Sequence, residues 1–485
     1  MNLRHPGFIR LVLIFLLVSP ANTGFAQQKL NPATELATLE RNIRAEMNFL
    51  AGDAMHGRGS ASGYERIAAE YMGSQFHQFG LEPAGDTNAS GAKSFVQKVT
   101  LQGLKFTEAP VLRATSGGQV RTWSFGRDLL VSFLRVPQTA GELQVIDADA
   151  TPTKGSVALV RLPAGVDRQK RQEVTRRARM AQAAAIILLE SDANKQMRES
   201  GKAPLPDLPT RFQTAPSGSG DSPFAAIALR PEAFAEIAAM PAGTRIEFGG
   251  PAQPSELGAT WNAIGMIRGS DPKMASEAVF LSAHLDHLGT GEPVNGDSIF
   301  NGADDDASGC VAVLELARAL ASGARPKRSL YFLGFGSEER GGWGAQYFIA
   351  HSPVPLEQIV ADLNLEMLGR PDAKVAANTL WFTGYDLSNL GPELARQGAR
   401  LVADPHPEQN FFQRSDNYTL AVRGVIAHTV SSFGLHTDYH RPSDEVSKID
   451  FPFMAEAIHS LIGPVRWLAD SSFRPAWEPG KKPTR

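Results

Sequence analysis

Hydrophobic positions follow a helical spacing in two stretches near the start of the chain. Residues 36–50 and residues 64–79 place apolar side chains three or four positions apart, which is the period of an amphipathic helix. A glycine-rich stretch, residues 52–63, separates the two, and Gly80 follows the second at the place of a helix C-cap. The sequence therefore predicts two helices joined by a loop.

Short apolar runs typical of strands dominate the chain from about residue 101 to residue 248. Residues 143–146, 157–160 and 186–189 are examples, and residues 167–184 among them have helical spacing. This texture predicts a small β-rich module with its own core, inserted into a larger domain.

From about residue 259 onward, apolar runs that suit buried strands alternate with helical stretches. Strands are predicted at residues 279–283, 330–335 and 359–365, and helices at residues 309–320 and 343–351. Regular alternation of strand and helix is typical of a parallel sheet covered by helices. The expected fold class is α/β with a mainly parallel sheet.

These changes of pattern divide the chain into five parts. We expect a signal peptide in residues 1–26, a main domain formed by residues 27–110 and 256–470, an insert in residues 111–255 and a flexible tail in residues 471–485. Arginines, a short apolar run and a small-residue stretch ending at Ala26 are the evidence for the signal peptide, which predicts a secreted or periplasmic protein. The apolar run is shorter than the ~20 residues of a membrane span, so no span is expected.

Composition and charge exclude several classes of partner and cofactor. The 48 Lys and Arg residues against 51 Asp and Glu residues give a net charge of −3, which provides no overall field for nucleic acid. The basic face of the helix at residues 167–184 is interpreted as solvated, because few aromatic residues accompany it. Cys310 is the single cysteine, so any metal must be held by His, Asp and Glu.

Clusters of such residues follow the predicted strands of the second half. They are HLDH at residues 284–287, DDD at 304–306, EE at 338–339, the lone Glu366, and HTDYHRPSD at 436–444. The carboxyl ends of parallel strands meet at one edge of a sheet, where sites form. Three consecutive carboxylates repel one another unless a cation is present or the loop is solvated and caps the following helix. A charge in the apolar run around Glu366 is costly if unpaired. Adjacent glutamates point to different sides, so one can ligate a metal while the other faces its bound water.

Taken together, these motifs resemble those of zinc-dependent aminopeptidases with a co-catalytic metal pair. Glutamate carboxypeptidases, glutaminyl cyclases and the catalytically silent transferrin receptors are relatives of that family. The resemblance extends to residues 49–51, 57–58 and 80–86, and residues 154–189 resemble the protease-associated domain often inserted in these enzymes. It implies an α/β zinc exopeptidase domain that removes N-terminal amino acids from peptides.

The resemblance also implies roles for single residues. Two Zn²⁺ ions would be held, and Asp304 would bridge them. The other ligands would be His284 and Glu366, a glutamate where the family usually has Asp, for one ion, and Glu339 and His440 for the other. Asp286 would orient the ring of His284, Glu338 would be the general base, and Tyr439 would steady the oxyanion. We interpret Asp305 and Asp306 as shaping the loop, and His287 and His436 as surrounding the site.

Other functions on the same fold stay open at this point. A carboxypeptidase needs a cationic group for the terminal carboxylate, and Arg340, Arg414 and Arg441 are candidates. A glutaminyl cyclase is expected to use one zinc, and a silent receptor is disfavoured because every ligand position holds a residue able to ligate. The expected partners are peptides with a free N-terminus. The sequence predicts neither the preferred residue nor the oligomeric state.

Overall fold

Fully buried strands form the centre of the larger sheet. The computed structural model describes residues 32–163, 165–166, 168–206, 211–212 and 223–484, so the expected signal peptide lies outside the described residues. Strands β13 (Ala278–His284), β16 (Ser329–Phe335) and β17 (Ile359–Leu365) are buried along their whole length and pair in parallel. Burial on both faces explains why their sequences are continuous apolar runs. All three predicted strands are confirmed.

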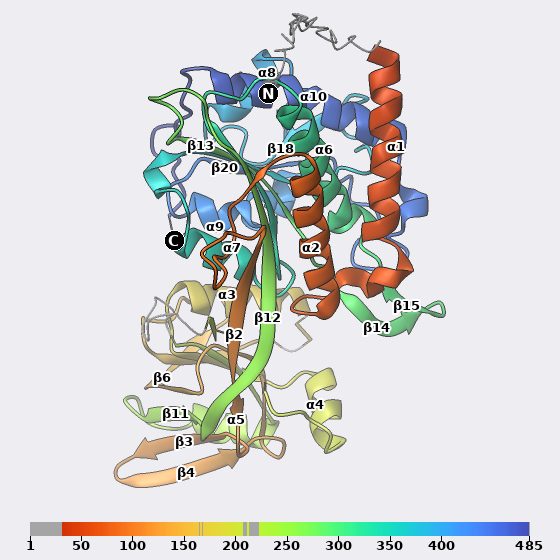
Figure 1. The fold of residues 1–485 in the computed structure, drawn as a ribbon. Helices are drawn as coiled ribbons and strands as arrows, with labels where there is room; N and C mark the ends of the chain where they lie inside the picture. The colour runs from red at the N-terminus through yellow and green to blue at the C-terminus, as the bar shows by residue number, and fades with distance from the viewer. Residues whose placement is uncertain (1–31, 164, 167, 207–210, 213–222, 485) are drawn as a thin grey trace, which may run out of the picture.

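The larger sheet is mixed rather than mainly parallel. Strand β20 (Ala427–Ser431) extends the parallel centre beside β17, but β18 (Leu380–Phe382) pairs with β20 in the antiparallel direction. On the other side, β12 (Ala252–Ile267) is antiparallel to β16 and to β2 (Val96–Phe106). The expectation of a mainly parallel sheet is therefore correct only for the centre, because the long pair β2 and β12 leads to and from the insert (Figure 1).

Helices cover both faces of this sheet. One face packs against α1 (Pro32–Leu50), α2 (Gly63–Gln78), α6 (Gly309–Ala321) and α10 (Phe451–Asp470). The other packs against the shorter α7 (Trp343–Ala350) and α9 (Asn417–Ala421). The four helices predicted in these regions are confirmed, and Gly80 follows α2 with φ +80° as a C-cap requires. The loop before α2 contains a short 3₁₀ helix, η1 (Asp53–Arg58).

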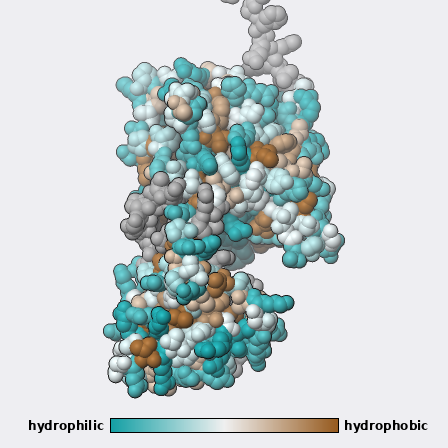
Figure 2. All heavy atoms as spheres, turned by 60° about the horizontal axis from the view of Figure 1, so that its bottom comes forward, coloured by the Kyte–Doolittle hydropathy of each residue, from teal (hydrophilic) through white to brown (hydrophobic). Residues whose placement is uncertain are grey.

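A second sheet lies between β2 and β12 in the sequence. Its strands are β3 (Val111–Ser116), β4 (Gln119–Ser124), β5 (Leu129–Leu134), β6 (Gln138–Asp147), β7 (Val157–Arg161), β8 (Ala185–Leu189), β10 (Ala225–Leu229) and β11 (Arg245–Gly249). Its short helices are α3 (Arg168–Met180), α4 (Asp192–Glu199) and α5 (Pro231–Ala238). Figure 2 shows this part as a lobe of its own. Helix α3 ends before the predicted residue 184, because Gln182 turns the chain with φ +57° toward β8. The resemblance to a protease-associated domain stays a prediction.

The segment after α10, expected to be flexible, lies against the main domain. Trp477 donates a hydrogen bond from Nε1 to the carbonyl of Gly424, at 3.3 Å, and its ring packs 5.3 Å from that of His428. The backbone N–H of Ala476 donates to the side chain of Asn389 at 2.8 Å. In the part of the chain described, no helix is both long enough and apolar enough to cross a bilayer.

Candidate metal centre

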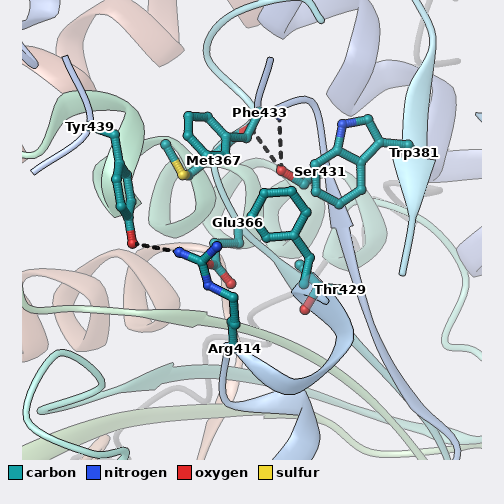
Figure 3. Close-up of a pocket in the computed structure, with 9 residues that line it drawn as sticks. Glu366, Met367, Trp381, Arg414, Thr429, Ser431, Phe433 and Tyr439 are labelled. Atoms are coloured by element: carbon teal, nitrogen blue, oxygen red, sulfur yellow. Dashed lines mark hydrogen bonds between the residues drawn. The ribbon is translucent and has the colours of Figure 1, made fainter. Parts of the chain in front are cut away.

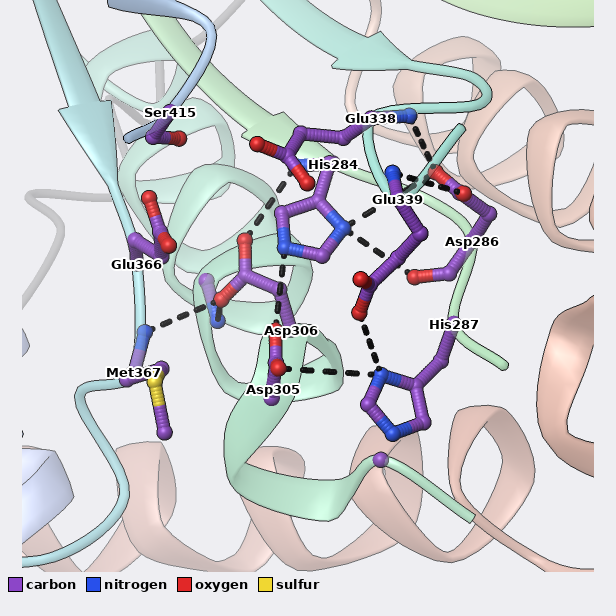
Figure 4. A network of polar contacts seen from close by, with 12 residues as sticks. His284, Asp286, His287, Asp305, Asp306, Glu338, Glu339, Glu366, Met367 and Ser415 are labelled. Atoms are coloured by element: carbon purple, nitrogen blue, oxygen red, sulfur yellow. Dashed lines mark hydrogen bonds and ion pairs between the residues drawn. The ribbon is translucent and has the colours of Figure 1, made fainter. Parts of the chain in front are cut away.

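The chemistry-bearing residues converge where the central strands end. His284 is the last residue of β13, Glu338 and Glu339 come shortly after β16, and Glu366 comes directly after β17. The turn Ala303–Ser308, which precedes α6, brings a carboxylate of the triple-aspartate motif to the same place. Figure 4 shows these side chains pointing toward one another. The predicted site at the carboxyl edge of the sheet is therefore brought together by the fold.

Asp305 occupies the centre of this arrangement. Its Oδ1 lies 3.1 Å from Nε2 of His284, and its Oδ2 lies 3.2 Å from Nε2 of His440. Nε2 of His440 is also 3.2 Å from Oε1 of Glu339. One carboxylate thus connects two sets of ligand atoms, which is the geometry that a bridging ligand needs.

Asp304, the residue expected in that central position, lies elsewhere. Its Oδ1 accepts a hydrogen bond from the backbone N–H of Gly369 at 2.8 Å, and its Oδ2 is 2.9 Å from Nε2 of His436. Because residues 303–308 form a tight turn, the three successive aspartates point in different directions. The structure therefore corrects the expectation: Asp305, not Asp304, lies between the two sets of ligand atoms.

Asp306 has the loop-shaping position that the sequence predicts. It accepts hydrogen bonds from the backbone N–H groups of His284, Gly309 and Met367, at 3.0 to 3.1 Å. These contacts tie the segment after β13 and the segment after β17 to the start of α6. Burial raises the pKa of Asp306 well above its usual range.

Asp286 acts on a different neighbour from the one expected. Nδ1 of His284 lies 3.0 Å from the backbone carbonyl oxygen of Asp286. The carboxylate of Asp286 is further from that nitrogen, at 3.8 Å. The carboxylate instead accepts from the backbone N–H groups of Glu338, at 2.9 Å, and Glu339, at 3.3 Å, and from the hydroxyl of Ser60. Asp286 therefore fixes the turn that holds both glutamates.

Glu338 points from that turn toward His284 (Figure 4). Burial raises the pKa of Glu338 well above its usual range. The carboxylates of Asp416 and Glu366 raise this pKa further, whereas a protonated His284 would lower it. A carboxylate in such surroundings accepts a proton readily, as a general base must.

Glu366 lies beside the cluster and also lines a neighbouring pocket. Its Oε2 accepts a hydrogen bond from the side chain of Asn364 at 3.2 Å, and burial raises its pKa. The pocket, shown in Figure 3, has four aromatic residues among the nine that line it. Its other lining residues are Met367, Trp381, Phe411, Arg414, Thr429, Ser431, Phe433 and Tyr439.

Tyr439 connects the pocket with the cluster. Its ring stacks on that of His440, with centroids 3.9 Å apart, and its hydroxyl accepts a hydrogen bond from Arg414 at 3.4 Å. Burial and the nearby carboxylates of Asp305 and Glu339 raise the pKa of this hydroxyl. The group therefore stays neutral and able to donate a hydrogen bond.

Several buried polar atoms at the centre make no well-aligned hydrogen bond among the described residues, although two of the histidine nitrogens lie at ion-pair distance from Asp305 and Glu339. They are Nε2 of His284, both ring nitrogens of His287 and Oε1 of Glu339. Unpaired buried polar atoms destabilise a fold, and a bound cation would satisfy them. One ligand atom each from His287, Asp305, Glu339 and His440 lie within 4.8 Å of one another. The residues present therefore fit a metal ion.

Two residues of this centre escaped the sequence prediction. The sequence predicts His287 at the edge of the site, yet its side chain belongs to the compact group of ligand atoms. The sequence feature that could have indicated this is the second His of the HLDH motif. Arg58 is fully buried and donates hydrogen bonds to the carbonyls of Leu285, Asn301 and Gly302, at 2.7 to 2.9 Å. Its guanidinium thus joins the two ligand-bearing segments, and its only signal is the motif at residues 57–58.

Comparisons with known proteins find a peptidase family model and several enzymes that are similar to parts of this chain. The model of peptidase family M28 matches residues 262–462. Leupeptin-inactivating enzyme 1 of Streptomyces exfoliatus is 33% identical over 118 residues, 24% of this chain and 24% of that protein. Aminopeptidase YwaD of Bacillus subtilis (strain 168) is 31% identical over 195 residues, 39% of this chain and 40% of that protein. The chain thus matches less than half the length of either relative.

A solved structure extends the comparison to the whole fold. The aminopeptidase from Aneurinibacillus sp. strain AM-1 has a TM-score of 0.52 at 18% sequence identity, and the match covers 93% of this chain and 99% of that one. This likeness shows a shared fold. The family match contains the central strands and the five residues grouped around the centre (His284, Asp305, Glu339, Glu366 and His440), so residues 262–462 of this chain are similar to peptidase family M28.

Proposed function

We propose that the protein is a zinc-dependent aminopeptidase, which hydrolyses the first peptide bond of peptides with a free N-terminus. The observation that carries the proposal is the position of Asp305 between His284 and His440, with Glu338 facing the same space. The aminopeptidases among the relatives and solved structures described above support the reaction type. Zinc is favoured over magnesium because imidazole nitrogens belong to both sets of ligand atoms.

Two zinc ions are proposed, one for each set of ligands. His284, Asp305 and Glu366 would hold the first, and Asp305, Glu339 and His440 would hold the second. Ions bound there would polarise the scissile carbonyl and lower the pKa of the attacking water. Buried atoms of His284 and Glu339 that make no well-aligned hydrogen bond support this assignment.

The protein's own groups supply proton transfer and charge stabilisation in this proposal. Glu338 takes the proton of the attacking water and delivers it to the leaving amine, and its raised pKa suits that role. Asp286 keeps Glu338 in place through the backbone N–H contact. The neutral hydroxyl of Tyr439 donates a hydrogen bond to the negative charge that develops on the carbonyl oxygen.

The substrate's first residue is proposed to bind between Glu338, Glu366 and the aromatic pocket. Its free amine gains charge complementarity from the two carboxylates, which is stronger in a buried site than in water. Its side chain enters the pocket lined by Trp381, Phe411 and Phe433. An apolar first residue is therefore the proposed substrate class. We further propose action outside the cytoplasm, on the signal-peptide pattern of residues 1–26.

A comparison of free and blocked peptides tests the reaction. We expect release of the first residue from peptides with a free N-terminus and no release from their N-acetylated forms, because the acetyl group removes the positive charge. Mass spectrometry of the products over time is the measurement, with a C-terminally amidated peptide as the control. Equal turnover of blocked and free peptides, or residues released from the C-terminus, would contradict an aminopeptidase.

Glu366 gives a test of the first metal position. Glu366→Ala should lower the zinc content by one of two equivalents, because it removes a carboxylate from the set of His284 and Asp305. Glu366→Asp should retain zinc and measurable activity, since a shorter carboxylate remains. Elemental analysis of purified protein measures the content, with Glu445→Ala, an exposed glutamate, as the control. Full zinc content in Glu366→Ala would make this residue structural.

A further inference from the structure

His287 is held in place as firmly as the proposed ligands. Its backbone N–H donates to the carbonyl of Arg58 at 3.1 Å, and its side chain has no exposed surface. Gly302 packs against the ring: a Cβ at this position would come 2.5 Å from the imidazole, and the residue has φ +60°. A glycine is needed for this approach, and the packing leaves the ring facing Glu339 and Asp305 (Figure 4).

The distances around His287 match those of a four-coordinate metal position. Its Nδ1 lies 2.9 Å from Oε1 of Glu339 and 3.7 Å from Oδ2 of Asp305. Nε2 of His440 lies 3.2 Å from each of the same two oxygens. Ligands about 2.0 to 2.1 Å from a tetrahedral zinc ion are about 3.3 Å apart, so these four separations are close to the edges of such a tetrahedron.

We propose that Nδ1 of His287 is a fourth protein ligand of the second metal position, in addition to Asp305, Glu339 and His440. The second position then has two imidazoles and two carboxylates, against one imidazole and two carboxylates for the first. It is therefore the tighter of the two and fills first. The inference deepens the proposed function, since it assumes a metal at this centre, but it does not depend on the reaction catalysed.

A hydrogen bond from His287 to Glu339 is the competing role, and one pair of variants separates the two. His287→Asn places an amide near the position of Nδ1; the amide can donate to Glu339 but is a poor zinc ligand. His287→Ala offers neither interaction. If His287 is a ligand, both variants should bind the first zinc equivalent at least about 10-fold to 100-fold more weakly than the wild type. Wild-type affinity in His287→Asn would overturn the proposal.

Competition with a chromophoric chelator measures these affinities without an activity assay. The control is His428→Gln, which replaces another fully buried histidine, one hydrogen-bonded to Ser388 and Thr383. It should keep wild-type zinc affinity. The melting temperature of the metal-free proteins shows whether the His287 variants are folded. If they are not, X-ray absorption of the wild-type protein decides whether His287 is a ligand.

X-ray absorption of the wild-type protein loaded with one equivalent of zinc counts the imidazoles directly. Two imidazoles on that zinc are expected; a single imidazole would overturn the proposal. Cobalt loaded in the same way should show the intense visible absorption of a four-coordinate ion. If the single bound zinc has two imidazole ligands but the protein shows no aminopeptidase activity, this inference holds and the proposed function is refuted. If the protein is active but that zinc has one imidazole, the proposed function holds and this inference is refuted.

Discussion

Glu338→Gln is expected to lower kcat for peptide hydrolysis by about 10² to 10⁴. The glutamine amide has nearly the same size but cannot accept the proton of the attacking water. Metal content and folding should be retained, because the side chain of Glu338 lies outside the group of ligand atoms formed by His287, Asp305, Glu339 and His440. Steady-state kinetics on a free peptide, with elemental analysis of the same sample, is the measurement.

Glu339→Gln is the matched variant for this experiment. It makes the same chemical change in the adjacent residue, whose Oε1 contacts His440 and His287. It should lose zinc from the second position as well as activity. Equal zinc loss in the two variants would mean that the base and the ligand have been exchanged in our assignment.

Asp305→Ala is expected to remove most of the bound zinc and with it nearly all activity. This carboxylate lies between His284 and His440, so its loss takes a ligand from both metal positions at once. Zinc content should fall further than in Glu366→Ala or Glu339→Gln, each of which affects one position. Elemental analysis after dialysis, compared across the three variants, measures the order.

Asp304→Asn provides the contrast within the same motif. The oxygens of Asp304 contact the backbone N–H of Gly369 and the ring of His436, and an amide can keep part of these contacts. This variant should retain zinc, with a lower melting temperature as its main effect. Loss of zinc in Asp304→Asn together with retention in Asp305→Ala would restore the assignment that the sequence alone suggested.

The sequence by itself determined most of the elements and the composition of the centre. Strands such as β13 and β17 were predictable because a strand buried on both faces must be apolar throughout. The clusters after these strands were recognisable because charged side chains in an otherwise apolar region are costly unless a partner such as a metal ion compensates their charge. Excluding thiolate ligands needed only the count of one cysteine.

Only the tertiary structure decided which members of each cluster meet. The three consecutive aspartates have nearly the same neighbours in the sequence, and the turn at Ala303–Ser308 alone directs Asp305 inward. The antiparallel pair β2 and β12, which makes the sheet mixed, depends on pairing between segments about 160 residues apart, and local periodicity contains no information on such pairing. Arg58 reaches carbonyls 227 to 244 residues further along the chain, and His287 joins the ligand atoms because Gly302 packs against its ring. Such contacts between distant segments form only when the chain folds. Local sequence patterns could therefore predict the helices and strands, whereas the tertiary structure determined which side chains lie close enough to act as ligands.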